Sequence, residues 1–439
     1  MQFGTKNSIS EGLKSQMKSK LTRVVGKIKK NEDGKVLVKN FAYLSLLQVA
    51  GYVFPLITMP YLARVIGIEG FGKIAFASAV MVWVQTIADW GFNFTATRDV
   101  AKNRDNSQMV SEIFSNVLWA RCVLMILSFV FLLLLIALFP KFRVNSNILL
   151  VSFLMVPGHI LFPDWFFQAM ERMKYITILN VISKLLFTIA VFVFIKDKED
   201  YIIQPLLTSL GFVVSGIIAF YYILVKWKIK LLKPSISKIK ETIRKSTDVF
   251  LNALMPNLYN SFSTVLLGVF WGEVANGKLD VGAKFVNIAQ QFMRVLSRTF
   301  FPFLSRKLDK HNVYAQLNIA LSLGMSVILF FSAPLIIDWL FTEEFAESVL
   351  VLRIMSISIF FLALNNIYGT NYMIIAGYES QLRNITAIVS VVGFAMSFPL
   401  IYFWGFIGAA ITVTLTRGLL GTSVMLRAKM LKQKDVRQD

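Results

Sequence analysis

The chain has 439 residues, of which 56% are hydrophobic and only 16% are charged. Soluble domains carry about 25% charged residues, so this composition excludes an ordinary soluble fold and favours a protein embedded in a bilayer. The formal net charge of +21 would suit nucleic-acid binding, but the basic residues are spread over loops between apolar runs. We therefore expect no nucleic-acid partner and attribute the charge to basic cytoplasmic loops.

The chain begins with a basic leader, residues 1–40, which we expect to lie in the cytoplasm. Its apolar residues recur at helical spacing, which is typical of an amphipathic helix on the inner leaflet; a disordered basic tail is the alternative. No small-residue cleavage site follows the first apolar run, so that run is predicted to be a retained membrane span. The apolar positions of the leader are Leu13, Met17, Leu21, Val24 and Ile28.

The rest of the chain is predicted to be an all-α polytopic membrane protein with about twelve transmembrane helices. A hydrocarbon core about 30 Å thick needs about 20 apolar residues per helix, and runs of that size follow one another along the chain. The predicted spans are 41–63, 74–97, 111–139, 147–169, 176–195, 201–225, 247–271, 282–304, 316–341, 347–375, 383–403 and 405–427.

Charge orients these spans and divides them. Basic residues dominate the leader and the segment 226–246, whereas acidic residues dominate the loops on the opposite side, so both termini are predicted to be cytoplasmic. The segment 226–246 is predicted to be a basic amphipathic linker, with Ile236, Ile239 and Ile243 on one face. It separates an N-terminal six-helix lobe, 41–225, from a C-terminal six-helix lobe, 247–427, which precedes a cytoplasmic tail, 428–439.

Motifs for catalysis or cofactor binding are not expected. Residues 67–73 match most of a phosphate-loop pattern, but Ile74 stands where the Mg²⁺-binding Ser or Thr would be. The two histidines, His159 and His311, are far apart, so no metal site is predicted. Short outside loops and the lack of paired carboxylates argue against the rival reading, a membrane enzyme acting on a polyprenyl substrate. We expect no cofactor and no catalytic residue.

Polar residues form stripes within four of the predicted spans. Positions four residues apart lie on one face of a helix, and stripes on the first two spans of each lobe predict a water-filled cleft between the lobes. The stripes are Gln48, Tyr52, Pro55 and Thr58; Gln85, Asp89, Asn93 and Thr97; Asn252, Pro256, Asn257, Asn260, Ser261 and Thr264; and Asn287, Gln290, Gln291, Arg294, Ser297 and Arg298.

Cations outnumber acids inside the spans, which favours an anionic substrate such as a diphosphate. Arg121 and Arg294 lie about ten residues into their spans, about 15 Å deep. Arg298 has snorkelling to head groups as an alternative role, and Asp89 has structural pairing with an Arg as an alternative to ion coupling. Lys184 and Arg417 face either packing or cleft. The predicted substrate-binding residues are Arg294, Arg121, Arg98, Arg353, Arg298, Gln290 and Asn257, with Asp89 as the predicted ion-coupling residue.

Several segments resemble the O-antigen flippase family (Wzx type), which belongs to the multidrug/oligosaccharidyl-lipid/polysaccharide exporter superfamily. The leader is the one departure, because it is longer than is usual for the family. The segments that carry the resemblance are 58–67, 70–76, 89–93 and 96–101, with further similarity at 164–171 and 405–410.

The resemblance implies two lobes related by a pseudo-two-fold axis that rock between inward-open and outward-open states. It implies a cargo of undecaprenyl-diphosphate-linked oligosaccharide repeat units, driven by an ion gradient. Membrane lipids and a polysaccharide polymerase and ligase are the expected partners. The alternative is a multidrug or toxin exporter of the same superfamily, which would need an acidic cleft; the excess of Arg argues against it.

Overall fold

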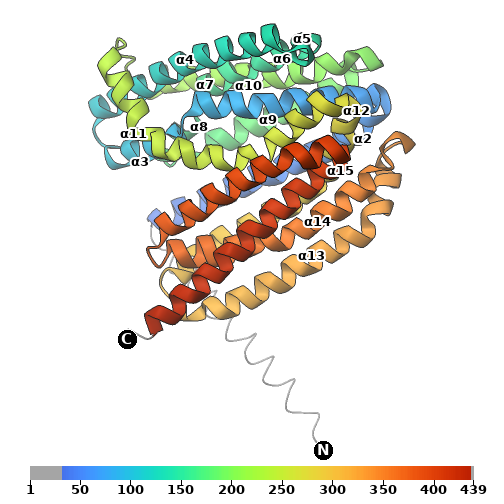
Figure 1. The fold of residues 1–439 in the computed structure, drawn as a ribbon. Coiled ribbons are helices and arrows are strands. Elements are labelled where there is room, and N and C mark those ends of the chain that lie inside the picture. The colour runs from blue at the N-terminus through green and yellow to red at the C-terminus, as the bar shows by residue number, and fades with distance from the viewer. Residues whose placement is uncertain (1–31, 437–439) are drawn as a thin grey trace, which may run out of the picture.

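The computed structural model describes residues 32–436, and all its regular elements in that range are helices (Figure 1). Eight helical segments in this range are long and apolar enough to cross a membrane. The prediction of an all-α polytopic protein is therefore confirmed. The predicted amphipathic helix of the leader, residues 13–28, lies outside the described residues.

The first half of the chain forms one group of helices, the N-terminal bundle. Asn106 caps the start of α4 by accepting a hydrogen bond from the Met109 backbone N–H at 3.0 Å. Pro163 stands between α7 and α8 and breaks the predicted span 147–169. The elements are α2 (Glu32–Asp89), α3 (Phe92–Lys102), α4 (Ser107–Leu138), α5 (Pro140–Val144), α6 (Ser146–Phe153), α7 (Met155–Leu161), α8 (Asp164–Ala169), α9 (Met173–Phe194) and α10 (Ile203–Tyr221), with a 3-10 turn at Lys198–Ile202 and a π-turn at Tyr222–Lys226.

The second half forms a second group, the C-terminal bundle, which α11 joins to the first. α11 ends at a short 3-10 turn that contains Pro256. The elements are α11 (Ile236–Leu254), the 3-10 turn Met255–Leu258, α12 (Ser261–Leu304), the 3-10 turn Leu308–Lys310, α13 (His311–Leu340), the 3-10 turn Glu343–Phe345, α14 (Ser348–Leu364), the π-helix Asn365–Ile374 and α15 (Glu379–Val436).

Three of these helices are two helices joined at a glycine. Gly67 in α2, Gly272 in α12 and Gly405 in α15 have φ values of 63°, 83° and 54°, which interrupt the helical geometry. Glycine adopts these values because it has no Cβ. Each glycine lies close to a boundary between two predicted spans. Each of these three helices therefore covers all or part of two predicted spans; α2, for example, covers 41–63 and most of 74–97. The total of twelve spans stays a prediction. We call the end of the molecule at which these three glycines lie the hairpin end.

The hydrophobic core is divided between the bundles. One cluster fills the N-terminal bundle around Phe76, Phe114 and Trp165. A second cluster fills the C-terminal bundle, and it also includes the part of α2 from Met59 to Phe71. The first predicted span therefore packs at the junction of the two bundles.

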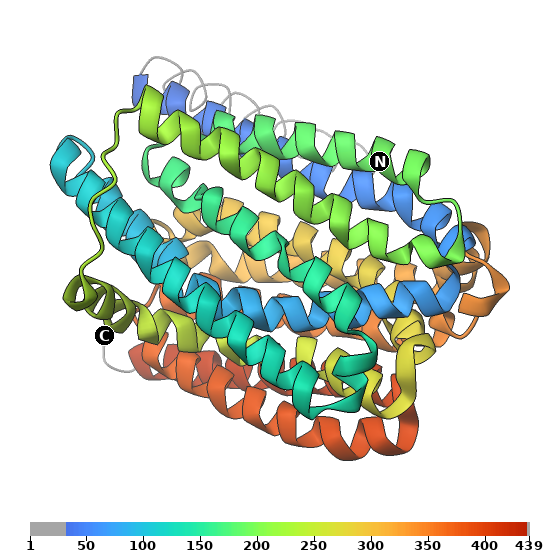
Figure 2. The same cartoon turned by 90° about the horizontal axis from the view of Figure 1, so that it is seen from above.

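The opposite end of the molecule, which we call the linker end, holds the extended stretch 227–235 that runs to α11 (Figure 2). Three side chains of α4 bind this stretch. The Lys230 N–H donates to Ser111 Oγ at 3.1 Å, the Leu232 N–H donates to Ser115 Oγ at 2.9 Å, and Trp119 Nε1 donates to the Leu232 carbonyl at 2.9 Å. The linker is therefore fixed to the N-terminal bundle.

The helix predicted within the linker forms, but it is longer than expected. α11 starts at Ile236, packs Ile239 and Ile243 against the N-terminal bundle, and continues to Leu254. It thus enters the segment predicted as the seventh span. The ends of an apolar run do not mark the ends of a helix here, because basic residues interrupt the apolar run but are compatible with a helix.

The two bundles pack closely and reciprocally at the hairpin end. A Cβ added at Gly72 would overlap the carbonyl group of Glu273, and a Cβ added at Gly277 would overlap the carbonyl oxygen of Ile68. Both glycines are required for this approach of one backbone to the other. The contact is repeated because the sequence is repeated: Gly67, Gly72 and Lys73 recur at one constant interval as Gly272, Gly277 and Lys278.

Polar contacts reinforce the hairpin end. Glu273 of the C-terminal bundle pairs with Lys141 at 2.6 Å and accepts a hydrogen bond from Asn145 at 3.1 Å. In the other direction, the Ile68 backbone N–H donates to the Glu344 carboxylate at 3.0 Å. Figure 1 shows the bundles close together at this end and splayed apart toward the linker end.

Candidate functional site

A polar pocket of about 250 Å³ lies within the C-terminal bundle, where α12, α14, its π-helical extension and α15 meet. Its charged groups are both cationic: the guanidinium groups of Arg294 from α12 and Arg417 from α15. The neutral polar groups of the lining are Tyr259, Asn260, Gln290, Asn365, Asn366 and Thr386.

Arg417 is buried in this pocket, with 6% of its surface exposed. Nη1 donates to Ser358 Oγ at 3.0 Å and Nη2 donates to Asn260 Oδ1 at 3.0 Å, so both partners are neutral. Its Nε atom is buried without an acceptor. A buried guanidinium group is costly unless a counter-charge compensates it, so Arg417 is suited to receive an anion.

Arg294 lies next to Arg417 and is the more exposed of the two. Its Nε donates to Gln291 Oε1 at 2.7 Å, and its guanidinium group lies within electrostatic reach of the hydroxyl of Tyr52 on α2. Arg298 and Arg417 are both close enough to repel it. Tyr52 of α2 therefore lies beside a cluster of cations in the other bundle.

The buried pair Arg121–Asp89 lies elsewhere, inside the N-terminal bundle. Arg121 is only 3% exposed, and its Nη2 donates to Asp89 Oδ1. His159 and Asp164 lie within electrostatic reach of the pair. Two further nitrogen atoms of Arg121, Nε and Nη1, are buried without an acceptor. This pair is largely neutral, in contrast to the pocket around Arg417.

The other predicted site residues are dispersed. Arg98 is exposed and pairs with Asp99 at 2.9 Å. Arg353 donates from Nε to the Phe330 carbonyl at 3.4 Å and lies over the ring of that residue. Asn257 bridges the bundles through a 3.0 Å hydrogen bond to Thr86 of α2.

Of the predicted set, the structure brings Arg294, Gln290 and Arg298 into one neighbourhood, and Gln290 donates to Ser358 at 3.4 Å. It does not bring Arg121, Arg98 or Arg353 there. Arg417 is the functional candidate that sequence reasoning left undecided. The signal was present, because Arg417 stands near the middle of the last predicted span.

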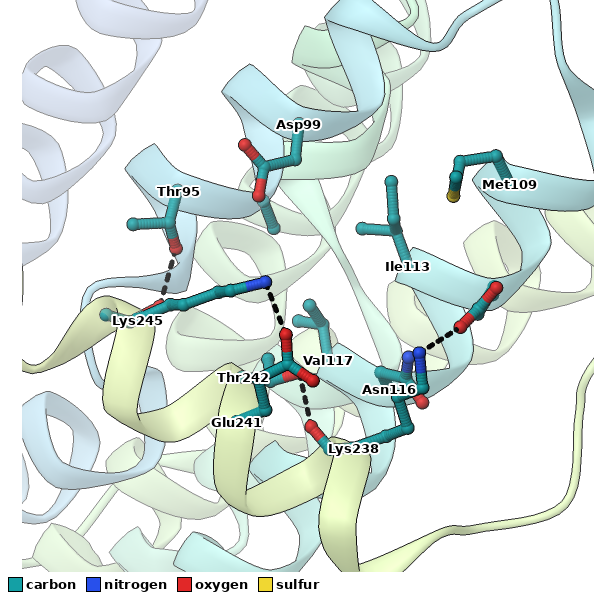
Figure 3. Close-up of a pocket in the computed structure, with 13 residues that line it drawn as sticks. Thr95, Asp99, Met109, Ile113, Asn116, Val117, Lys238, Glu241, Thr242 and Lys245 are labelled. Atoms are coloured by element: carbon teal, nitrogen blue, oxygen red, sulfur yellow. Dashed lines mark hydrogen bonds and ion pairs between the residues drawn. The ribbon is translucent and has the colours of Figure 1, made fainter.

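A larger pocket, of about 300 Å³, lies at the linker end between α3, α4 and α11 (Figure 3). Its lysines are matched by acids: Lys238 pairs with Glu112 at 3.0 Å and Lys245 pairs with Glu241 at 2.6 Å. The hydrogen bond from Lys245 lowers the pKa of the Glu241 carboxyl. The Lys238–Glu112 pair fastens α11 to α4 of the N-terminal bundle. Because both lysines are paired with acids, this pocket offers no free cation to an anionic ligand.

One more contact links α11 to the N-terminal bundle beside that pocket. The hydroxyl groups of Thr95 on α3 and Ser246 on α11 are 2.7 Å apart and share a hydrogen bond. The rings of Trp90 and Phe250 stack with centroids 3.8 Å apart. α11 is thus held along its length by the N-terminal bundle, although its end leads into the other bundle.

Comparison with known proteins gives a consistent result for the sequence. Residues 37–308 match the model of a family described as "Polysaccharide biosynthesis protein". An Escherichia coli (strain K12) protein named as a candidate O-antigen transporter is 28% identical over 398 residues, covering 89% of this chain and 96% of that protein. A Staphylococcus aureus protein named "Capsular polysaccharide biosynthesis protein CapF" is 23% identical, covering 87% of this chain and 96% of that protein.

Solved structures show the same fold at low identity. "Lipid II flippase MurJ, inward closed conformation" is similar with a TM-score of 0.71 and 14% identity, covering 89% of this chain and 87% of that one. A crystal structure of a MATE protein has a TM-score of 0.60 and 14% identity, covering 92% and 97%. Both similarities concern the arrangement of helices.

Proposed function

Since the chain belongs to the polysaccharide biosynthesis protein family, we propose that it is a flippase of the cytoplasmic membrane. Its cargo is an undecaprenyl-diphosphate-linked oligosaccharide repeat unit of O-antigen or a related surface polysaccharide, and it moves this cargo by alternating access. The names of the curated relatives and the similarity to a lipid II flippase support the proposal.

The observation that carries the proposal is the cationic pocket of Arg417 and Arg294. Among the described residues, no Asp or Glu lines it. A diphosphate would compensate both guanidinium groups, because each can donate two parallel hydrogen bonds to phosphate oxygens. The sugar would occupy the polar remainder of the pocket, formed by amides such as Gln290 and Asn260 that can bond hydroxyl groups. The polyprenyl chain would stay in the bilayer.

The movement would use the two ends of the molecule in turn. The structure has its bundles packed at the hairpin end by Gly72 and Gly277. With the termini in the cytoplasm, as the loop charges predict, this is the state closed to the outside. Opening that end while closing the linker end would carry the head group across. Asp89 is proposed to couple the change to an ion gradient through its pairing with Arg121.

The chain would transport the cargo without changing it chemically. Chemistry on the cargo would belong to the enzymes that make the unit inside and to a polymerase and ligase that receive it outside. The chain itself offers a cationic pocket and two bundles that can move, which are the parts that a carrier needs.

Reconstituted protein tests the proposal. Liposomes that contain the purified chain and a fluorescent undecaprenyl-diphosphate-linked glycan would report translocation through quenching of the outer leaflet. We expect Arg294→Ala and Arg417→Gln each to slow translocation by about thirtyfold or more, the effect of removing one partner of a buried charge-assisted contact. Arg306→Ala, which removes an exposed arginine near the end of α12, is the matched control. Unchanged translocation in both pocket variants would remove the pocket from the pathway.

The alternative is a drug exporter, and the similarity to a MATE structure is the observation that favours it. Ethidium efflux from cells that express the chain separates the two functions. A flippase with a cationic pocket repels ethidium, so no efflux above the vector control is expected. Ethidium efflux that disappears in Arg294→Ala would support the exporter.

A further inference from the structure

A third cavity, of about 250 Å³, lies within the N-terminal bundle between α2, α9 and α10. Among the residues that the structure describes, Lys184 is the only charged one that lines it. This lysine stands eleven residues into α9, about 16 Å along the helix axis from its start. That depth places the ammonium group near the middle of a predicted span, where a charge is a functional candidate by default.

The ammonium group has no acidic partner. Among the described residues, no Asp or Glu forms an ion pair with Lys184. Several neutral polar side chains of the cavity already have hydrogen-bond partners. Asn180 donates to the Ile176 carbonyl at 2.9 Å, Ser183 donates to the Gly211 carbonyl at 3.0 Å, and Thr208 donates to the Gln204 carbonyl at 3.0 Å. The cavity therefore contains one uncompensated positive charge.

Four phenylalanine rings contribute to the walls of the cavity. Phe54, Phe162, Phe187 and Phe212 line it from four different segments of the bundle. A single cation set among aromatic rings suits a ligand that carries an anionic group at the end of an apolar chain. Phosphate attached to a lipid has that chemistry, whereas a free hydrophilic anion would gain nothing from the rings.

Neighbouring residues of α2 lie close to a cation in each bundle. A Cβ placed on Gly51 would lie 3.2 Å from Lys184 Nζ, so the lysine reaches the backbone of α2 at that point. The hydroxyl of the next residue, Tyr52, lies within electrostatic reach of Arg294. Consecutive residues of one helix thus face a cation in each bundle, at the same level of that helix.

We propose that the Lys184 cavity is a second anion site, which binds a lipid-borne phosphate inside the N-terminal bundle. The site rests on the proposed function only for the identity of the lipid, which is the undecaprenyl carrier in a flippase and a bilayer phospholipid otherwise. The phenylalanine rings of the cavity contact the first part of the lipid's apolar chain, while Lys184 compensates the charge of the phosphate.

Native mass spectrometry of the purified full chain tests the site with two probes, undecaprenyl phosphate and phosphatidylglycerol. Lys184→Met removes the charge and keeps the length of the side chain. We expect it to weaken binding of the preferred lipid about tenfold, the effect of losing one charge-assisted hydrogen bond. Lys174→Met, which removes an exposed lysine from the same helix, is expected to bind like the wild type.

A second variant tests the cavity without changing its charge. Gly51→Val adds a branched side chain against the ammonium group, and we expect it to weaken binding while Lys184→Arg retains it. Preference for undecaprenyl phosphate assigns the carrier lipid, and preference for phosphatidylglycerol assigns a bilayer lipid. Equal binding by wild type, Lys184→Met and Gly51→Val overturns the site and leaves the proposed function standing. If the wild-type protein did not translocate the glycan at all, the proposed function would be overturned instead.

Discussion

At the scale of single residues, the two buried guanidinium groups differ in their partners. Arg121 is beside a carboxylate, that of Asp89, whereas Arg417 has the neutral acceptors Ser358 and Asn260. Removing a charge from water costs several kcal/mol unless another charge compensates it. The fold therefore supplies a counter-charge to the first arginine and only neutral partners to the second.

The pair Arg121–Asp89 gives a stability prediction. Asp89→Asn leaves the guanidinium group buried and unpaired, so we expect the free energy of unfolding in detergent to fall by about 3–5 kcal/mol. The double variant Asp89→Asn/Arg121→Met removes both charges and should recover most of that loss. Denaturant titration followed by tryptophan fluorescence measures both.

The control for this prediction is the exposed pair Arg98–Asp99. Asp99→Asn should change the free energy of unfolding by at most about 1 kcal/mol, because water solvates the partner that remains. If Asp89→Asn were no more harmful than Asp99→Asn, the buried pair would contribute nothing to stability.

Arg417 gives a prediction about geometry rather than charge. Arg417→Lys keeps the positive charge but loses the fork that reaches Ser358 and Asn260 at once. We expect the apparent KM for the lipid-linked glycan to rise about tenfold, with little change in the amount of inserted protein. Arg427→Lys, on the same helix but at an exposed position, should leave KM unchanged; an equal rise in both variants would contradict the specific role.

Sequence reasoning reached part of this site and missed part of it for a physical reason. Gln290, Arg294 and Arg298 share one face of one helix, so their spacing alone predicted that they would be neighbours. Arg353 stands on another helix, and its direction depends on how that helix packs. A pattern along one helix contains no information about the rotation of the next one, which is why Arg417 stayed undecided.

At the scale of the elements, hydropathy was a good guide to helices and a poor guide to their ends. The predicted span 176–195 corresponds closely to α9, Met173–Phe194. The predicted span 147–169 is interrupted at Pro163, and the seventh span merges with the linker helix. Apolar length reports the thickness of the bilayer, whereas helix ends depend on caps, prolines and glycines.

The hairpin glycines give a prediction for one pair of elements. Gly72→Leu places a side chain where the Glu273 backbone lies, so we expect the hairpin end to stay open and translocation to fall at least about tenfold. Insertion should be normal, because the residue lies at a contact between bundles. Maleimide labelling of a cysteine introduced at Ile68 would report the opening.

Gly324→Leu is the matched control for that variant. Gly324 is also a helical glycine, on α13, but a Cβ there would meet nothing within 4 Å. Translocation in this variant should equal the wild type. Full activity in Gly72→Leu would show that the bundles do not need to approach this closely.

At the scale of the whole molecule, alternating access requires the bundles to separate at the hairpin end. Lys141 and Glu273 stand on different bundles, and their charged groups are 2.6 Å apart. We expect a short reducible cross-linker between Lys141→Cys and Glu273→Cys, in a Cys122→Ser background, to stop translocation. Reduction should restore it, and the glycan assay measures both states.

A second cross-link separates the effect of tethering from the effect of labelling. Lys278 and Glu347 also pair across 2.7 Å, but both belong to the C-terminal bundle. Cysteines at these positions should cross-link without loss of translocation. If both cross-links were tolerated, the bundles would not have to part at this end.

The break at Pro256 is the place where the backbone would bend if the two bundles rotated relative to each other. α11, which precedes the break, is bound to the N-terminal bundle by contacts such as the hydrogen bond between Thr95 and Ser246, whereas the residues after the break belong to the C-terminal bundle. A rotation of one bundle against the other would therefore bend the backbone at this break. Asn260, four residues beyond it, accepts a hydrogen bond from Arg417. A ligand that drew the guanidinium group away from Asn260 would remove this hydrogen bond beside the break. We therefore expect binding in the pocket to make the rotation of one bundle against the other easier.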